Sequence, residues 1–156
     1  MKNNKGFSLV ELIIVIAIMA ILVGVMAPQL IKYIEKSKVS ADTQLADSVH
    51  TAVLTAMMDP EIVNASNYNN EYNGYTTATA VAGLNNTTVG SISSGALEIL
   101  GVTTGTAVDG SLKSTNASAV SFQITGTNSL SVWVQGSDAS GSKGRNSATS
   151  TMIVVK

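Results

Sequence analysis

The N-terminal part of the chain begins with a long apolar run. From Leu12 to Pro28 the sequence contains no charged residue, and the stretch from Phe7 to Ile31 is 25 residues long. A helix of this length can cross a hydrocarbon core about 30 Å thick. We therefore predict a hydrophobic helix over residues 7–31, which requires either lipid or other copies of itself around it.

Beyond the apolar run the pattern becomes amphipathic, and we predict that the helix continues over residues 32–59. Apolar side chains recur at spacings of three and four, which places them on one stripe of a helix. This stripe consists of Ile34, Ala41, Leu45, Val49, Ala52, Val53 and Ala56. Charged residues, Asp42 and Asp47 among them, are expected mostly off the stripe. Asp59 should end the helix, because the residue before Pro60 avoids helical backbone angles.

The stripe needs a globular head to pack against, and residues 60–156 are expected to form it. Strict alternation over residues 120–125 and 130–135, around a turn, predicts a β-hairpin. Residues 150–156 predict a final strand. The predicted fold class is α+β, a long N-terminal α-helix whose distal half packs on a small antiparallel β-sheet. Trp133 points away from its two valine neighbours, toward either the outer side of the sheet or a subunit contact.

The rest of the head gives weaker signals. Residues 61–117 are rich in Asn, Thr, Ser and Gly, a composition that favours turns and irregular backbone. One short helix is expected there, with Ser93 as its cap and Gly101 as its end. His50, the single histidine, is expected on the surface or at the edge of the core and is given no role.

Composition excludes several classes of function. Charged residues make up 12% of the chain and the formal net charge is −1, so there is no basic footprint for nucleic acid. The chain has no cysteine, which excludes disulfides, thiolate metal sites and a cysteine nucleophile. No phosphate-binding glycine loop, metal-ligand spacing or catalytic triad pattern is present. We expect no catalytic residues, no metal and no cofactor.

Glu11 is the residue that a plain membrane helix does not explain. An unpaired carboxylate in a bilayer costs ~3 kcal/mol or more, and less near the interface. A secretory signal peptide is disfavoured, because the apolar run is too long and no small-residue cleavage site leads into a polar domain. A simple membrane anchor accounts for the run but not for the carboxylate. Cleavage after Gly6 would create a matching cation, the α-amino group of Phe7, for Glu11 of the same or a neighbouring chain.

The segment Lys5-Gly-Phe-Ser-Leu-Val-Glu11, with the apolar run that continues to Gly24 and Pro28, resembles the processing motif of type IV prepilins of the type IVa-like, major-pilin class. The resemblance implies that residues 1–6 are a leader peptide, removed between Gly6 and Phe7 by a prepilin peptidase that also N-methylates Phe7. It implies an assembly role for Phe7 and for Glu11, which would register a new subunit against its neighbour's N-terminus. Gly24 and Pro28 would mark a segment that loses helical hydrogen bonds when subunits pack.

The function implied is that of a structural subunit that polymerises into an extracellular type IV pilus through helix packing. Motility, adhesion or DNA uptake would belong to the assembled fibre. The partners implied are other copies of the chain, the prepilin peptidase, the assembly platform and its motor proteins. The precursor would lie in the cytoplasmic membrane and the finished pilus on the bacterial cell surface.

Two other functions remain open from sequence. A pseudopilin of a type II secretion or competence system would share the same N-terminal motif, and a solitary membrane-anchored binding protein would share the anchor. Pilin heads often close a C-terminal loop with a disulfide, and this chain departs from that pattern. Strand pairing by residues 151–156 is expected to hold the loop at 136–149 instead.

Overall fold

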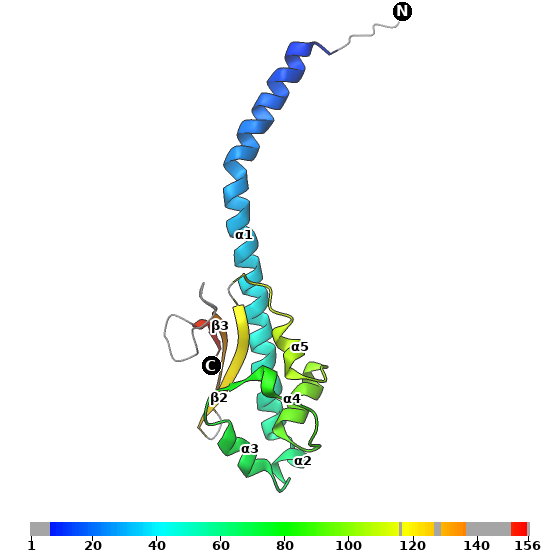
Figure 1. The fold of residues 1–156 in the computed structure, drawn as a ribbon, viewed down its shortest axis with the longest axis vertical. Helices are drawn as coiled ribbons and strands as arrows, with labels where there is room; N and C mark the ends of the chain where they lie inside the picture. The colour runs from blue at the N-terminus through cyan, green and yellow to red at the C-terminus, as the bar shows by residue number, and fades with distance from the viewer. Residues whose placement is uncertain (1–6, 116, 127–128, 137–150, 156) are drawn as a thin grey trace, which may run out of the picture. The chain divides into compact units, whose positions relative to one another are not determined.

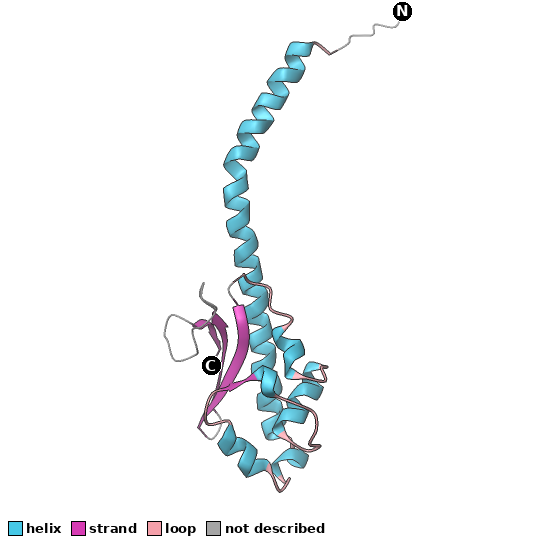
Figure 2. Cartoon of the chain, in the orientation of Figure 1, coloured by secondary structure: helices cyan, strands magenta, loops and turns pink. Residues whose placement is uncertain are grey.

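The computed structural model describes residues 7–115, 117–126, 129–136 and 151–155. The chain divides into two compact units, residues 1–37 and 38–156. Helix α1 (Leu9–Met58) runs through both (Figure 1). All of the described strands belong to the second unit, and Figure 2 colours the strands magenta. The predicted α+β fold, with a long N-terminal helix and a small antiparallel sheet, is confirmed.

Helix α1 ends where the proline predicted. Its last residue is Met58, and Asp59 then serves as the N-cap of the short helix α2 (Pro60–Val63). The Asp59 side chain accepts a hydrogen bond from the backbone N–H of Glu61 at 2.9 Å. Pro60 occupies the first turn of α2, where its missing N–H leaves no helical bond unmade. The same two residues therefore stop one helix and start the next.

The predicted apolar stripe is confirmed over its C-terminal part. Val49, Ala52, Val53 and Ala56 are fully buried in the core of the second unit. Ile34, the first residue of the predicted stripe, is 48% exposed. The buried face of α1 in the second unit thus begins several residues later than the periodicity indicated.

Asp42 corrects the predicted pattern, because it lies on the buried face and is only 1% exposed. It stands four residues before Ala46, which is also buried, so both face the same side of the helix. One carboxylate oxygen accepts from the backbone N–H of Lys113 at 2.8 Å, and the other from that of Ser114 at 2.9 Å. Two backbone donors offset the loss of water around the charge. Asp42 therefore ties α1 to a segment 71 residues away in sequence.

The sheet has four antiparallel strands in the order β1-β2-β3-β4. Strand β1 (Thr79–Ala80) is only two residues long, and the others are β2 (Ala117–Gly126), β3 (Ser129–Gly136) and β4 (Thr151–Val155). Strands β2 and β3 form the predicted hairpin. Their register pairs Val120 with Val134, Phe122 with Val132 and Ile124 with Leu130. All six of these residues are at most 2% exposed, so one face of the hairpin lies in the core.

This sheet face and the buried face of α1 form one hydrophobic cluster. Figure 1 shows β2 running alongside the C-terminal part of α1. His50 on α1 lies at the edge of the contact, with Nε2 at 3.2 Å from the carbonyl oxygen of Leu130, as expected for a residue at the edge of the core. Trp133 is on the opposite sheet face and is 7% exposed, so it is buried within a single chain. It therefore offers little surface to another subunit.

The region 61–117 is more regular than its composition indicated. Besides α2 it contains α3 (Tyr68–Gly74), a short 3-10 helix (Val81–Gly83), α4 (Ile92–Leu100) and α5 (Gly105–Asp109). The predicted short helix is α4, and Gly101 ends it in the left-handed conformation with φ of 69°. Its N-cap is Ser91 and not Ser93, because the Ser91 side chain accepts from the backbone N–H of Ser94.

Two further carboxylates join segments of the head. Glu71 of α3 accepts from the backbone N–H of Ile92 at 2.7 Å and from the Ser93 hydroxyl at 3.3 Å. Asp109 at the end of α5 accepts from the backbone N–H of Val120 in β2 at 2.8 Å. With Asp42, they form a set of three carboxylate bridges to backbone N–H groups. No apolar periodicity predicts such bridges, so the structure of this region was hardly predictable from its pattern of apolar residues.

Burial sets the pKa of two groups near these bridges. Burial raises the pKa of Tyr75, the nearby Glu71 carboxylate raises it further, and a hydrogen bond with Ser93 lowers it. Burial also raises the pKa of Asp109, although the hydrogen bond from Val120 opposes this shift. Folding therefore lets Asp109 hold its proton at a higher pH than the unfolded chain does. The stability linked to this group is present below its unfolded pKa and is lost as the pH rises through its folded pKa.

We predict that Asp42→Asn lowers the free energy of unfolding of the head by about 1–3 kcal/mol. The amide nitrogen of Asn would replace one of the two acceptor oxygens and would face a backbone N–H donor. Unfolding of the full-length chain in detergent, followed by the fluorescence of the single Trp133, measures this loss. Asp47→Asn, at an exposed position on the same helix, is the matched control. Equal stability of both variants would contradict the role of Asp42.

We predict that Asp109→Asn is at least as stable as the natural chain at pH 7. The Asn oxygen still accepts from Val120, and the partly buried charge is gone. The difference should disappear below about pH 3, where an Asp is largely protonated in the folded and unfolded states alike. Asp109→Ala, which removes the acceptor, should be less stable by about 1 kcal/mol. The same fluorescence assay over a pH series measures both, and a lower stability of Asp109→Asn at pH 7 would contradict the assignment.

Candidate functional site

The candidate site is the start of α1, where Phe7 and Ser8 precede the first helical residue, Leu9. The Glu11 carboxylate accepts a hydrogen bond from the backbone N–H of Ser8, with Oε2 at 2.9 Å from the nitrogen. The backbone N–H of Leu12 donates to the carbonyl of Ser8 at 3.3 Å. Ser8 is therefore the N-cap, and Glu11 occupies the third helical position.

This contact is half of a capping box, in which the side chain at the third helical position reaches back to the N-cap backbone. The sequence carries its signature, Ser8-Leu-Val-Glu11, although the predictions for Glu11 concerned its charge and its pairing with the Phe7 amine and not a helix cap. A carboxylate in the first turn is also stabilised by the positive end of the helix dipole. Glu11 thus has a partner within its own chain. The bond uses one oxygen of the carboxylate, and the donor is one residue from Phe7, whose amine cleavage would expose.

Phe7 is 89% exposed. Gly6, the other residue of the predicted cleavage junction, and the predicted leader 1–6 lie outside the described residues. The structure thus places Phe7 and Glu11 at one helix end, which is the arrangement that the predicted pairing of amine and carboxylate requires. Cleavage at the junction and methylation of Phe7 stay predictions.

Apolar side chains cover all sides of α1 in the first unit. Every large apolar side chain from Leu9 to Ile34 is between 46% and 73% exposed. The most apolar 18-residue window of this helix has a mean hydropathy of 3.0 and is not buried in the chain. By length and composition the helix is able to cross a membrane. Contiguous exposed apolar surface of this extent marks a membrane or protein contact.

Gly24 and Pro28 are four residues apart, so they would share one helical hydrogen bond. Pro28 has no N–H to donate, and the carbonyl of Gly24 consequently loses its partner in the helix. Helix α1 nevertheless continues through both residues (Figure 1). A Cβ atom added at Gly24 would meet nothing within 4 Å. The packing of a single chain therefore does not require a glycine at this position.

Within the described part of the chain, no three His, Asp or Glu side chains gather in a way that could hold a metal ion. At the start of α4, the hydroxyl group of Ser91 lies within hydrogen-bond distance of the hydroxyl groups of Ser93 and Ser94, and the Ser93 hydroxyl also donates to Glu71. They are parts of the fold of the head. Among the described residues, the candidate functional groups are therefore those at the start of α1, Phe7 and Glu11.

Residues 1–27 match the family model described as the prokaryotic N-terminal methylation motif. The chain is 41% identical over 56 residues to the type IV major fimbrial protein FimA of Dichelobacter nodosus, an alignment that covers 36% of each protein. It is 44% identical over 55 residues to a fimbrial protein of Moraxella nonliquefaciens, covering 35% of this chain and 36% of the relative. It is 35% identical over 86 residues to a fimbrial protein of Pseudomonas aeruginosa, covering 53% of this chain and 56% of the relative.

The chain thus spans between about a third and just over half the length of these curated relatives. No solved structure matches it. The relatives are named as fimbrial proteins and not as enzymes, in agreement with the expectation of a structural protein. Together, the motif match and the relatives confirm the resemblance to type IV pilins that Gly6, Phe7 and Glu11 predicted.

Proposed function

We propose that this chain, which has the N-terminal motif and the α+β fold of a type IV pilin, is a structural subunit of an extracellular type IV pilus. The observation that carries the proposal is the apolar surface of α1, exposed on every side from Leu9 to Ile34. A single chain cannot shield this surface from water. Lipid shields it before assembly, and the helices of neighbouring copies shield it in the filament.

Proteolytic processing prepares the subunit to move from the membrane into the filament. A prepilin peptidase cleaves between Gly6 and Phe7 and methylates the new amine of Phe7. The precursor lies in the cytoplasmic membrane with Lys2 and Lys5 on the cytoplasmic side, in accord with the positive-inside rule. Removal of the leader takes away both lysines and exposes a cation at the helix start. The assembly platform and its motor proteins then move the subunit from the membrane to the fibre.

Glu11 registers each new subunit in the fibre. In the apolar core, the ammonium group at Phe7 of one copy pairs with the Glu11 carboxylate of its neighbour. The capping bond from Ser8 holds this carboxylate at the helix start, where the ammonium of the neighbour reaches it. In a site without water, opposite charges at contact distance attract far more strongly than at a surface. A subunit placed out of register leaves both charges buried without a partner.

Gly24 and Pro28 let α1 adapt to its neighbours during this transfer. The carbonyl of Gly24 already lacks its helical donor, so less energy is needed to open the helix there than elsewhere. A glycine also allows the backbone of another helix to approach closely, as small residues do at helix contacts in membranes. The open space around Gly24 in the single chain is consistent with a contact that another copy fills.

Mass spectrometry of sheared surface material is the direct test of processing. We expect a mature chain that begins at a methylated Phe7 and lacks residues 1–6. An intact Met1 in surface material would contradict the proposal and favour a solitary membrane-anchored protein. Electron microscopy of the same fraction distinguishes a long pilus from the short filament of a pseudopilin.

We predict that Glu11→Gln and Glu11→Ala both abolish filaments while the chain stays in the membrane. Removing one partner of a buried ion pair costs about 3–5 kcal/mol. Gln keeps an acceptor oxygen for the Ser8 N–H and so preserves the helix cap, whereas Ala removes both cap and charge. Filament yield in the sheared fraction, relative to membrane-bound subunit, is the measurement. Natural filament yield from Glu11→Gln would show that capping, and not charge pairing, is the role of this residue.

A further inference from the structure

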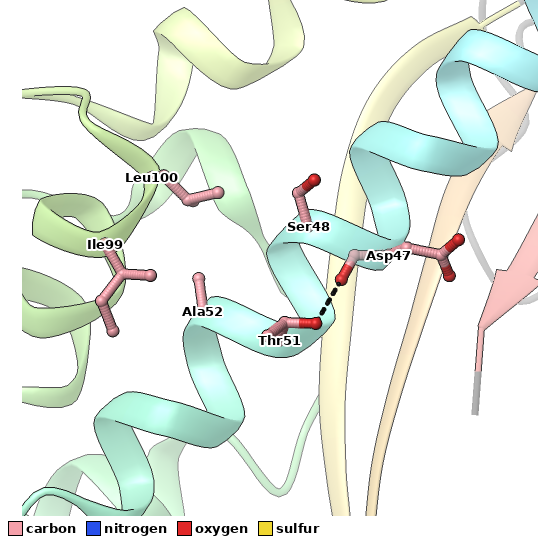
Figure 3. A pocket seen from close by; sticks show the side chains of 6 residues that line it. All are labelled: Asp47, Ser48, Thr51, Ala52, Ile99 and Leu100. Carbon is pink, nitrogen blue, oxygen red and sulfur yellow. Dashed lines mark hydrogen bonds between the residues drawn. The ribbon is translucent and has the colours of Figure 1, made fainter.

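A shallow groove runs between α1 and α4 on the surface of the second unit. Figure 3 shows one end of it, where Ile99 and Leu100 of α4 face Ala52 on α1, next to Asp47 and Thr51. Ile99 also lines an adjoining hollow of about 750 Å³. The two hollows share this residue and so form one continuous surface, which we call the α1/α4 groove.

The floor of the groove is partly apolar. Val89 and Ile99 line it and are 93% and 50% exposed, respectively. The described part of the second unit has only four large apolar side chains that are exposed, the other two being Met58 and Val63. Half of the exposed large apolar side chains of the described head therefore lie in this groove. Such a concentration is typical of an interaction surface.

The rim of the groove is acidic. The described part of the second unit has seven carboxylate side chains, and four of them, Asp42, Asp59, Glu71 and Asp109, accept hydrogen bonds from backbone N–H groups of that unit. The remaining three are Asp47, Glu61 and Glu98, and all three line the α1/α4 groove. No Lys or Arg is among the residues that line it. The groove therefore suits a partner that presents cations beside an aromatic or apolar side chain.

The chain itself carries such a surface on the first unit. Lys32 and Lys36, one helical turn apart on α1, line a hollow together with Gln29 and Tyr33. Tyr33 is 69% exposed, so its ring is available for contact. The two lysines provide cations on one helix face, as residues four positions apart do. Their charge and apolar content complement those of the groove.

We propose that the α1/α4 groove of one copy binds the Lys32–Lys36 face of a second copy. The lysine ammonium groups lie against Glu98 and its acidic neighbours, and the Tyr33 ring packs on Ile99. The proposal rests on the filament function proposed above and names a contact within the filament that is separate from the pairing of Phe7 with Glu11. Complementary charges of this kind set the register and exclude wrong orientations.

Cysteine cross-linking tests the contact directly, because the natural chain has no cysteine. Cells that make Tyr33→Cys and Ile99→Cys as two separate variants should build mixed filaments. Treatment of sheared filaments with a short bismaleimide should then give dimers that contain one copy of each variant. Val63→Cys in place of Ile99→Cys is the matched control, since Val63 is an exposed apolar residue of the head outside the groove.

The outcomes separate the two proposals. Mixed dimers from Ile99→Cys but not from Val63→Cys support the groove contact. Intact filaments in which both pairs cross-link equally, or not at all, overturn the contact and leave the filament function standing. Absence of filaments from the parent chain overturns the filament function and the contact with it.

Charge reversal gives a second measurement. Lys36→Glu and Glu98→Lys should each lower filament yield about tenfold or more, because each places like charges face to face across the interface. The two changes combined in one chain should restore most of the yield. Lys113→Glu makes the same change of charge at an exposed position outside the α1/α4 groove and outside the hollow at Lys32 and Lys36, and it should leave the yield unchanged. Loss without restoration in the double variant would contradict the pairing.

Discussion

A helix that is apolar on every side is stable only where water is excluded, and this constraint governs the first unit of the chain. The apolar residues of α1 up to Ile34 find no cover within their own chain. Any state of the protein must therefore supply that cover from outside, by lipid or by other helices. The same constraint explains why the buried face of α1 is confined to its C-terminal part. The head covers α1 only from Asp42 onward, where the buried residues of the helix begin.

The head is held to α1 by two kinds of interaction, apolar packing and hydrogen bonds. Val49 and Val53 of α1 belong to the same hydrophobic cluster as the buried face of the β2–β3 hairpin, and apolar packing of this kind is not directional. The bonds from Asp42 to two backbone N–H groups fix the position of one segment relative to the helix. Glu71 and Asp109 do the same between other segments of the head. A region rich in turn-forming residues thereby takes up a defined set of short helices.

Patterns with a period were predictable from the sequence. Alternation in β2 and β3 predicted the hairpin, and the spacing of apolar residues predicted the buried stripe of α1, because both reflect burial of one face. Asp42 was misplaced, since a carboxylate is expected in water unless its donors are known, and those donors come from a distant segment. The capping bond between Ser8 and Glu11 has a local signature in Ser-x-x-Glu, so it was predictable from the sequence in the same way as a helix cap in a soluble protein. Short helices such as α3 and α5 are fixed partly by the side-chain bonds of Glu71 and Asp109, which leave no periodic pattern in the sequence.

The bridges from Asp42, Glu71 and Asp109 join segments of the head without covalent bonds, and in this they differ from disulfides. A disulfide needs an electron acceptor at the moment of folding, and its bond can be lost to a reductant afterwards. A hydrogen bond from a backbone N–H group to a carboxylate forms as the chain folds, and its formation involves no transfer of electrons. Because the chain contains no cysteine, the head forms no disulfide, and no oxidation of thiols takes part in its folding. A reductant therefore has no disulfide in this head to break.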